Sequence, residues 1–171
     1  MQAFHKTTAC ATFIIFTIAQ INCMEYCPPG WMDWNQSCYM ITPRPMLWRD
    51  VHQLCRSFGA RMAVPSSDGE NRFISDVALK LQSPLWIDCT DKDNEGMWVC
   101  SEDVSPGTGY RQFSPGQPND YPGEADFAQM NTNYRRTWSD QPDKLTFSMC
   151  EKKKTCSSIL SCQAANVVEC N

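Results

Sequence analysis

A chain of 171 residues is long enough for one domain with a hydrophobic core, and its formal net charge is −4. This acidic balance argues against a nucleic acid or an anionic membrane surface as the partner, because both are bound through basic patches. The 11 cysteines indicate an oxidising compartment, since so many thiols in a cytosolic protein would need metal-binding or catalytic roles.

Residues 1–19 predict a secretory signal peptide. Lys6 precedes an apolar run over 9–19 that is too short to span a bilayer. The alternative is a buried N-terminal helix or strand. Cleavage after Ala19 removes Cys10 and leaves ten cysteines, an even number that can pair completely. No second long apolar run follows, so we expect a secreted protein without a membrane span.

The first predicted elements after the signal segment are a hairpin and two helices. Residues 27–41 indicate a short hairpin whose two cysteines, 11 positions apart, can staple it. Apolar residues recur at three- and four-residue steps over 46–58 and predict an amphipathic helix. A second helix is predicted to begin at the capping box Ser67-x-x-Glu70 and to run to about Leu81.

The second half of the chain predicts short strands around a long irregular loop. Residues 101–125 are rich in glycine and proline and show little periodicity, and a loop of this length is usually functional or disordered. Two helices followed by short strands indicate an α+β domain. The predicted strands are 60–64, 86–87, 97–99, 127–130 and 145–149.

Eight short motifs occur along the chain in a specific order and spacing. They are Cys27-Pro-Pro-Gly-Trp31, Cys38-Tyr39, Leu54-Cys55-Arg56, Trp86-Ile87-Asp88-Cys89, Asp93-Asn94-Glu95-Gly96-Met97-Trp98-Val99, Gly116-Gln117-Pro118-Asn119-Asp120, Trp138-Ser139-Asp140 and Met149-Cys150-Glu151. Together they resemble the C-type lectin-like domain family over residues 27–151. The resemblance implies a double-loop α+β fold with two helices, short antiparallel strands and a long irregular loop. It leaves 20–26 as an N-terminal linker and 152–171 as a cysteine-containing tail.

The resemblance also implies two disulfides. One family bridge joins the first helix to the last strand, which here means Cys55–Cys150, and another staples the N-terminal hairpin as Cys27–Cys38. A further family-wide bridge is missing, because Phe127 takes its first position and its second position also lacks a cysteine.

Six cysteines lie outside these two bridges once Cys10 is removed. Cys89 and Cys100 flank the acidic turn 91–96, and a bridge between them would brace the long-loop region. Alternatively, each of them pairs with a cysteine of the tail. The remaining four form two bridges or interchain links that would make a covalent oligomer. These are Cys23, Cys156, Cys162 and Cys170.

Sugar-binding members of the family hold Ca²⁺ with oxygen ligands, and the sugar hydroxyls coordinate the same ion. The resemblance places Gln117, Asn119 and Asp140 at ligand positions, with a cis proline expected between the first two. Ser139 stands where the family has asparagine and Ala125 where it has glutamate, so few charged oxygens remain for an ion that takes six to eight. The triplet combines mannose-type and galactose-type patterns, which leaves the sugar class open. The implied carbohydrate-binding residues are Gln117, Asn119, Ser139 and Asp140.

A neighbouring calcium position of the family retains more acidic residues. Asp91, Glu95 and Asp120 match it, and Glu124 is a fourth candidate. The alternative is a solvated acidic turn, since this composition is also typical of ordinary turns. The full set of candidate Ca²⁺ ligands is Asp91, Glu95, Asn119, Asp120, Glu124 and Asp140.

Two functions follow from these expectations. The first is a secreted C-type lectin that binds glycans, with Ca²⁺ as a cofactor held by the long loop. The second is a lectin-like module that binds a protein ligand and carries a degenerate sugar site. Catalysis is not expected, because His52 is the single histidine of the mature chain and lies between core positions of a predicted helix. The sequon Asn35-Gln36-Ser37 predicts N-glycosylation of a surface loop.

Overall fold

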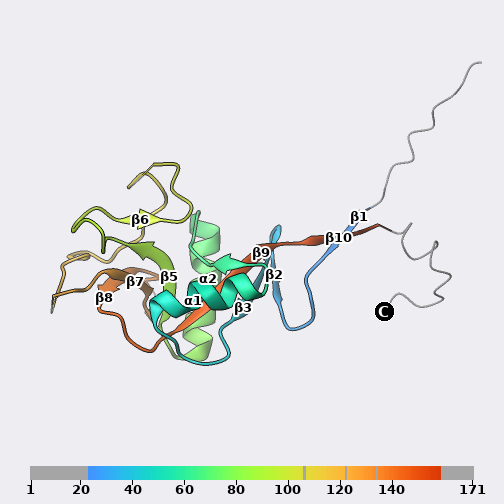
Figure 1. The fold of residues 1–171 in the computed structure, drawn as a ribbon, viewed down its shortest axis with the longest axis horizontal. Coiled ribbons are helices and arrows are strands. Elements are labelled where there is room, and N and C mark those ends of the chain that lie inside the picture. Colours follow the sequence, from blue (N-terminus) through green and yellow to red (C-terminus); the bar gives the residue numbers. More distant parts are fainter. Residues whose placement is uncertain (1–22, 106, 122, 134, 159–171) are drawn as a thin grey trace, which may run out of the picture. The chain divides into compact units, whose positions relative to one another are not determined.

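The computed structural model describes residues 23–158 except 106, 122 and 134. Within this range the chain forms two helices and ten strands (Figure 1). The predicted signal peptide and the cysteines at 162 and 170 lie outside the described residues. The elements are β1 (Cys23–Tyr26), β2 (Met32–Trp34), β3 (Ser37–Ile41), α1 (Trp48–Ser57), β4 (Arg61–Met62), α2 (Asp68–Leu81), β5 (Leu85–Thr90), β6 (Val99–Cys100), β7 (Phe127–Met130), β8 (Trp138–Gln141), β9 (Phe147–Lys153) and β10 (Thr155–Ser158).

Most strands belong to one mixed sheet. Its order is β2-β3-β9-β5-β7-β8, with β4 paired to β9 and β6 paired to β5. The β5–β9 pair is parallel, and the other described pairs of this sheet are antiparallel. Strands β1 and β10 form a separate two-stranded sheet, and one compact unit spans Glu25–Thr155. The architecture is the α+β fold that the sequence predicts.

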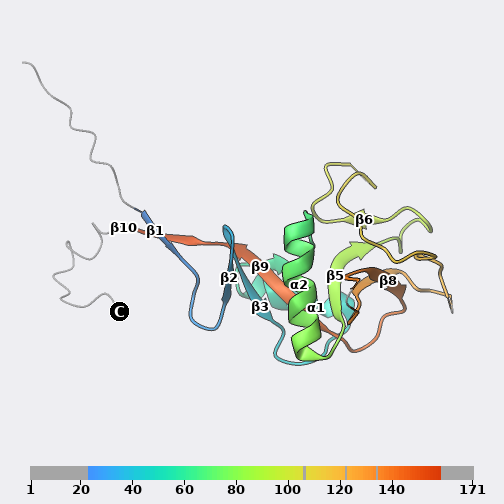
Figure 2. The ribbon, with the colours of Figure 1, turned by 180° about the vertical axis from the view of Figure 1, so that it is seen from behind.

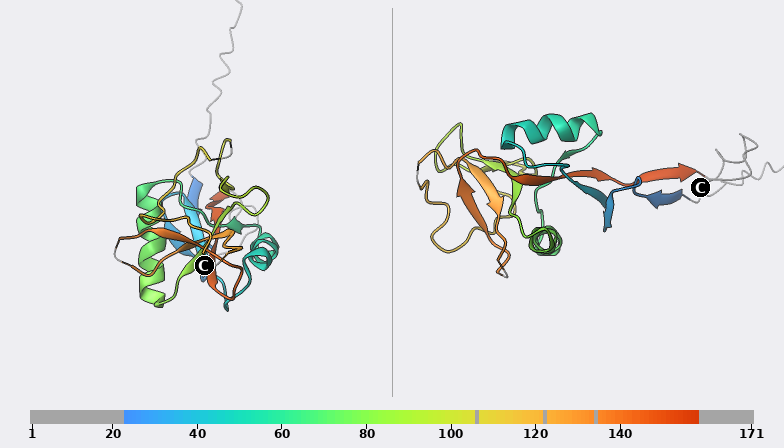
Figure 3. Two further views of the ribbon diagram at one scale, coloured as in Figure 1. Left: turned by 90° about the vertical axis from the view of Figure 1, so that its left-hand side faces the viewer. Right: turned by 90° about the horizontal axis from the view of Figure 1, so that it is seen from below.

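The two helices cover opposite sides of the central strand β9, as the view from below in Figure 3 shows. Helix α1 packs its buried Val51 and Cys55 toward β4 and β9. Seen from behind in Figure 2, α2 lies in front of the sheet, and its contacts include β7. In the described part of the chain, neither helix is long and apolar enough to cross a membrane.

Helix α1 confirms the predicted amphipathic helix and takes its N-terminal cap from a distant segment. Leu47, the residue at the cap position, offers no side-chain hydrogen bond. The Oδ1 atom of Asp143 instead accepts a hydrogen bond from the Trp48 N–H at 2.7 Å. This contact satisfies one of the free N–H groups of the first turn and ties α1 to the segment before β9.

Helix α2 begins at the predicted capping box, but the Glu70 side chain accepts hydrogen bonds from Ser66 rather than from the Ser67 N–H. Ser67 Oγ accepts a hydrogen bond from the Glu70 N–H at 3.3 Å, as expected for a cap. The buried Glu70 carboxylate accepts hydrogen bonds from the Ser66 N–H, the Ser66 hydroxyl and the Tyr39 hydroxyl, at 2.9, 2.7 and 2.6 Å. The start of α2 is therefore fastened to β3.

Three disulfides lie within the compact unit Glu25–Thr155. Cys27–Cys38 and Cys55–Cys150 form as the resemblance implies. Cys89 pairs with Cys100, so the alternative in which each of them pairs with the tail is wrong. Cys156 is disulfide-bonded as well.

An aromatic cluster occupies the region where the family-wide bridge is missing. The ring of Phe127 lies 4.8 Å from the ring of Trp48 and 6.3 Å from that of Trp86, measured between centroids. Phe127 is 5% exposed and Trp86 is 1% exposed, so the cluster is part of the core. Phe127 therefore contributes a buried apolar ring at the position where the resemblance places the first cysteine of that bridge.

Candidate functional site

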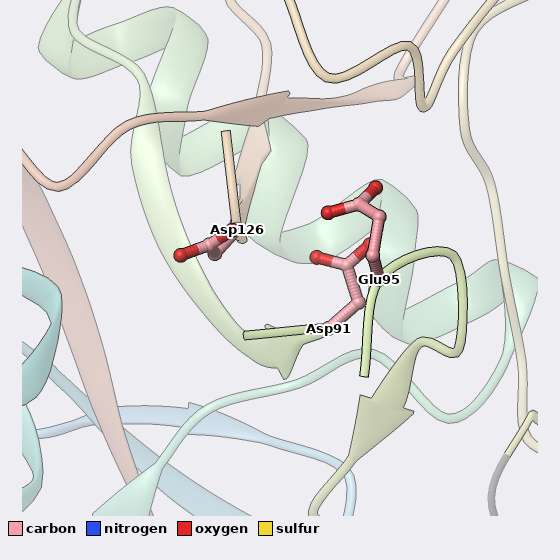
Figure 4. Close-up of side chains that lie close together, drawn as sticks. All are labelled: Asp91, Glu95 and Asp126. Carbon is pink, nitrogen blue, oxygen red and sulfur yellow. The ribbon is translucent and has the colours of Figure 1, made fainter. Parts of the chain in front are cut away.

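Three carboxylates converge where the turn after β5 meets the segment before β7 (Figure 4). One oxygen each of Asp91, Glu95 and Asp126 lies within 4.8 Å of the others. The sheet register brings them together, because Thr90 of β5 pairs with Phe127 of β7 and the next residues outward are Asp91 and Asp126. The Asp91 N–H donates to the Asp126 carbonyl oxygen at 3.2 Å, which fixes the two backbones beside each other.

Asp91 is a buried acid with one unsatisfied oxygen. Its Oδ2 accepts a hydrogen bond from the Gly96 N–H at 3.0 Å, whereas its buried Oδ1 has no partner. Burial, followed by the charges of Asp126 and Asp140, raises the pKa of the Asp91 carboxyl above its ordinary value. The charge of Asp91 in turn raises the pKa of the exposed Glu95 carboxyl. Burial is thus the main cause of the raised pKa of Asp91, and repulsion from Asp91 is the main cause of the raised pKa of Glu95.

The predicted sugar-binding triplet wraps around a second buried acid. The Gln117–Pro118 peptide bond is cis, as expected. Asp140 is 1% exposed, and its Oδ2 accepts hydrogen bonds from the N–H groups of Asn119 and Asp120 at 2.9 and 2.6 Å. The Asp140 N–H donates to Gln117 Oε1 at 3.3 Å, and the buried Asp140 Oδ1 has no partner. Gln117, Asn119 and Asp140 are therefore one hydrogen-bonded unit.

Asp120 and Glu124 occupy different positions on the long loop. Asp120 Oδ1 accepts a hydrogen bond from the Ala125 N–H at 3.0 Å and so closes the loop onto the segment before β7. Glu124 is exposed and has a positive φ of 56°. Among the described residues, the three-carboxylate group contains neither of them.

Ser139 turns away from the triplet. Its hydroxyl donates to Asn131 Oδ1 at 2.9 Å, across the β7–β8 ladder. Successive side chains of a strand point to opposite faces of the sheet, and Ser139 directly precedes Asp140 in β8. The structure therefore separates Ser139 from the other three predicted carbohydrate-binding residues.

Sequence reasoning missed Asp126. A signal for it exists, because Asp126 directly precedes the predicted strand 127–130. Antiparallel pairing of that strand with β5 would have set Asp126 against Asp91, but the pairing of strands is not visible in the sequence pattern.

The arrangement fits a hard divalent cation. Ca²⁺ is held by carboxylate and carbonyl oxygens, several of them charged. Asp91, Glu95 and Asp126 supply three carboxylates at one point, and the unpartnered Oδ1 of Asp91 is the kind of buried oxygen that an ion would satisfy.

Comparisons with known proteins agree with this fold. A family model described as the Lectin C-type domain matches residues 44–168. Lactose-binding lectin l-2 of Anguilla japonica is 28% identical over 131 residues, which cover 75% of this chain and 79% of that protein. C-type lectin domain family 17 member A of Homo sapiens is 32% identical over 133 residues, 76% of this chain but 33% of that protein. The chain thus spans about a third of that larger relative.

Solved structures give the same result. The carbohydrate-recognition domain of the mouse scavenger receptor C-type lectin superimposes with a TM-score of 0.66 at 28% identity, covering 75% of this chain and 98% of that one. A calcium-independent type II antifreeze protein superimposes with a TM-score of 0.67 at 25% identity, covering 77% and 98%. The family model covers well over half of the chain, and the described fold has the two helices and mixed sheet of these structures. The chain belongs to the C-type lectin domain family.

Proposed function

We propose that this protein is a secreted lectin whose carbohydrate-binding loop is organised by Ca²⁺. The observation that carries the proposal is the meeting of Asp91, Glu95 and Asp126 at one point, with a buried oxygen of Asp91 lacking any partner. Asp91, Glu95 and Asp126 would hold the ion, and Asp120 and Glu124 of the long loop are the candidates to complete its shell.

The proposed sugar contacts lie on the neighbouring triplet. Gln117 and Asn119 carry the amide groups that would face sugar hydroxyls. Asp140 holds both residues, because its carboxylate accepts the Asn119 N–H and its N–H donates to Gln117 Oε1. Tyr121 follows the triplet and is 78% exposed, so its ring offers a flat apolar surface for the C–H face of a sugar. Because one relative is named a lactose-binding lectin, lactose is the first ligand to test.

Secretion and glycosylation belong to the same proposal. Residues 1–19 have the composition of a signal peptide, and three described disulfides suit an extracellular protein. Asn35 lies exposed in the turn between β2 and β3, where an attached oligosaccharide would extend into solvent. An interchain disulfide through a cysteine of the tail would make a covalent oligomer.

The orientation of Ser139 and the burial of Ala125 favour a second function. Ala125 is 2% exposed and has no ligand oxygen in its side chain, and Ser139 bonds Asn131 rather than the triplet. A loop that lacks these two family ligands could serve as a surface for a protein ligand. Under this alternative, Ca²⁺ would stabilise the loop without contacting a sugar.

Calcium titration by calorimetry tests the ion site. Asp91→Asn keeps the size of the side chain and an oxygen for the Gly96 N–H but removes the charge. We expect this variant to bind Ca²⁺ about tenfold or more weakly, since the charge count of the ligands sets calcium affinity over several decades. Asp93→Asn is the matched control, because Asp93 is exposed in the same turn and lies outside the three-carboxylate group.

A wild-type protein that gives no calcium heat would contradict the proposal. Equal weakening in the Asp91→Asn and Asp93→Asn proteins would mean that the turn attracts the ion only through its net charge.

A glycan array read with and without a chelator, together with a lactose titration, separates the two functions. The lectin proposal expects a chelator-sensitive signal that Tyr121→Ala lowers and that Tyr26→Ala, a change at an exposed tyrosine of β1, leaves intact. Calcium binding without any glycan signal would favour the protein-binding alternative.

A further inference from the structure

The turn that carries Asp91 and Glu95 is closed at its base by a disulfide. Cys89 and Cys100 lie directly opposite each other in the β5–β6 ladder, with their Cα atoms 4.0 Å apart. Everything between these two cysteines, including both acidic residues, belongs to the closed segment. The bridge therefore controls how far the two ends of the acidic turn can separate.

Backbone pairing at this base is short. Strand β6 has two residues, and its described register consists of Cys89 with Cys100 and Thr90 with Val99. Two register pairs give a ladder little stability of its own, since isolated two-stranded ribbons are marginal in water. The covalent bond therefore adds a strong connection between β6 and the sheet to these two register pairs.

The bridge is anchored in the core, whereas the tip of the turn is not. Cys89 is 0% exposed and Cys100 is 3% exposed, and both belong to the core cluster that contains Trp98. Residues 92–97 are exposed. Asp91 therefore lies at the fixed base of the turn, beside Asp126. Glu95 lies in the exposed part of the turn and approaches both from there.

The chain that leaves Cys100 is fastened as well. The Cys100 N–H donates to Asp103 Oδ2 at 3.0 Å, and the Ser101 N–H donates to the Asp88 carbonyl oxygen at 3.1 Å. Arg111 forms an ion pair with Asp103, which is 2% exposed in its side chain. The chain that follows β6 is therefore tied to β5 through Asp88 and to the long loop through Asp103 and Arg111.

Like charges oppose this arrangement. Asp91, Glu95 and Asp126 lie within 4.8 Å of one another, and without a cation their carboxylates repel. The hydrogen bond from the Asp91 N–H to the Asp126 carbonyl oxygen holds the first residue of the turn beside the segment before β7. The hydrogen bonds from Gly96 to Asp91 Oδ2 and from Asn94 to the Asp91 carbonyl oxygen act within the turn. The other end of the turn, which carries Glu95, is tied to the sheet through β6 and its disulfide.

We propose that the Cys89–Cys100 disulfide is a positioning element for calcium, which holds Glu95 near Asp91 and Asp126 before the ion binds. This inference rests on the proposed calcium site. Without the bridge the turn would relax outward, and part of the free energy of calcium binding would be spent on drawing it back.

The test compares two disulfide deletions of equal loop length. The variant Cys89→Ser with Cys100→Ser removes the bridge in question, and Cys27→Ser with Cys38→Ser removes a bridge with the same sequence separation of 11 residues. The chain-entropy model gives both deletions the same effect on the unfolded chain, so urea unfolding should show similar losses of stability. Calcium titration should show a loss of affinity only in the first variant, between about 5-fold and 150-fold, the range typical of coupling between two sites.

A second variant guards against failure to fold. Cys89→Ala with Cys100→Val also breaks the bridge but fills the buried space with apolar atoms, and it is expected to lose calcium affinity in the same way.

Three results are distinguishable. Absence of calcium binding in the wild-type protein would overturn the proposed function itself. Wild-type affinity in either variant that lacks Cys89–Cys100 would overturn the positioning role while leaving the calcium site intact. Equal weakening in the Cys27–Cys38 deletion would also overturn it, because general loss of stability would then explain the effect.

Discussion

Asp91 combines burial with an incomplete set of hydrogen bonds. Its residue exposure is 4%, one carboxylate oxygen accepts the Gly96 N–H, and the other has no partner. Burial and the neighbouring acids Asp126 and Asp140 both disfavour the charged form, so the pKa of Asp91 is raised. A cation at this point would reverse both effects, since it would satisfy the free oxygen and neutralise the repulsion.

Calcium affinity should therefore decline on mild acidification. Ca²⁺ binds the deprotonated carboxylates, and the raised pKa values of Asp91 and Glu95 mean that protons compete at a higher pH than they do for ordinary carboxyls near about 4. Calorimetric titrations at a series of pH values would measure the decline. The Asp126→Asn protein should bind Ca²⁺ more weakly at neutral pH. Its calcium affinity should begin to decline only at a lower pH, because one charge that repels Asp91 is gone. Constant affinity down to the ordinary carboxyl range would contradict this assignment.

The free energy of unfolding of the ion-free protein should change in the opposite direction and rise on mild acidification. A carboxyl whose folded-state pKa is raised binds more protons in the folded than in the unfolded state between the two pKa values. The free energy of unfolding of the ion-free protein should accordingly gain a contribution from Asp91 as the pH falls through its raised pKa.

The acidic turn also shows what single residues do and do not reveal in a sequence. Asp91 and Asp93 are equivalent by composition, yet one is buried and the other exposed. The difference arises from the pairing of β5 with β7, which is a long-range contact. The family pattern identified Asp91 and Glu95 without that contact, whereas Asp126 required it.

At the scale of elements, the amphipathic helices were the most predictable parts. The prediction of a helix over 46–58 corresponds to α1 at Trp48–Ser57, and the capping box set the start of α2 correctly. Strand β8 was not predicted, because Trp138-Ser139-Asp140-Gln141 has a single large apolar residue and forms a strand only through pairing with β7. Strand β9 continues through Lys152 and Lys153 for the same reason, since both pair with β3.

Phe127 of β7 is expected to be important for stability. Phe127→Ala would leave a cavity against Trp48 and Trp86 and should lower the free energy of unfolding by about 3–5 kcal/mol. Urea unfolding followed by tryptophan fluorescence would measure this. Leu145→Ala is the control, because Leu145 is 68% exposed and surface changes usually stay within about 0.5 kcal/mol. Similar losses in the two variants would contradict this expectation.

At the scale of the whole molecule, the family resemblance predicted more than periodicity did. Its motifs fall on packing positions such as Trp138 at 0% exposure and on the Cys55–Cys150 bridge, whose partners are 95 residues apart. Such positions are fixed by the fold and so can be recognised by their order. The path of the long loop is not fixed in this way, because a loop without periodicity carries little information about its backbone. The separation of the Ser139 and Asp140 side chains has another cause, because both residues lie in β8 and successive side chains of a strand point to opposite faces.

The Cys89–Cys100 bridge has a consequence for the redox behaviour of the protein. If the bridge strengthens calcium binding by some factor, thermodynamic linkage requires calcium to stabilise the bridge against reduction by the same factor. Reduction by dithiothreitol moves two electrons and two protons to the two cysteine sulfurs, and the reagent becomes a cyclic disulfide. Equilibration in buffers of reduced and oxidised dithiothreitol, followed by alkylation and mass spectrometry, would give the fraction of each bridge that remains.

Calcium should shift the equilibrium of Cys89–Cys100 toward the disulfide and leave that of Cys27–Cys38 unchanged. An equal effect of calcium on both bridges would contradict the linkage. Bound calcium would then disfavour reduction of the same disulfide that positions the calcium ligands.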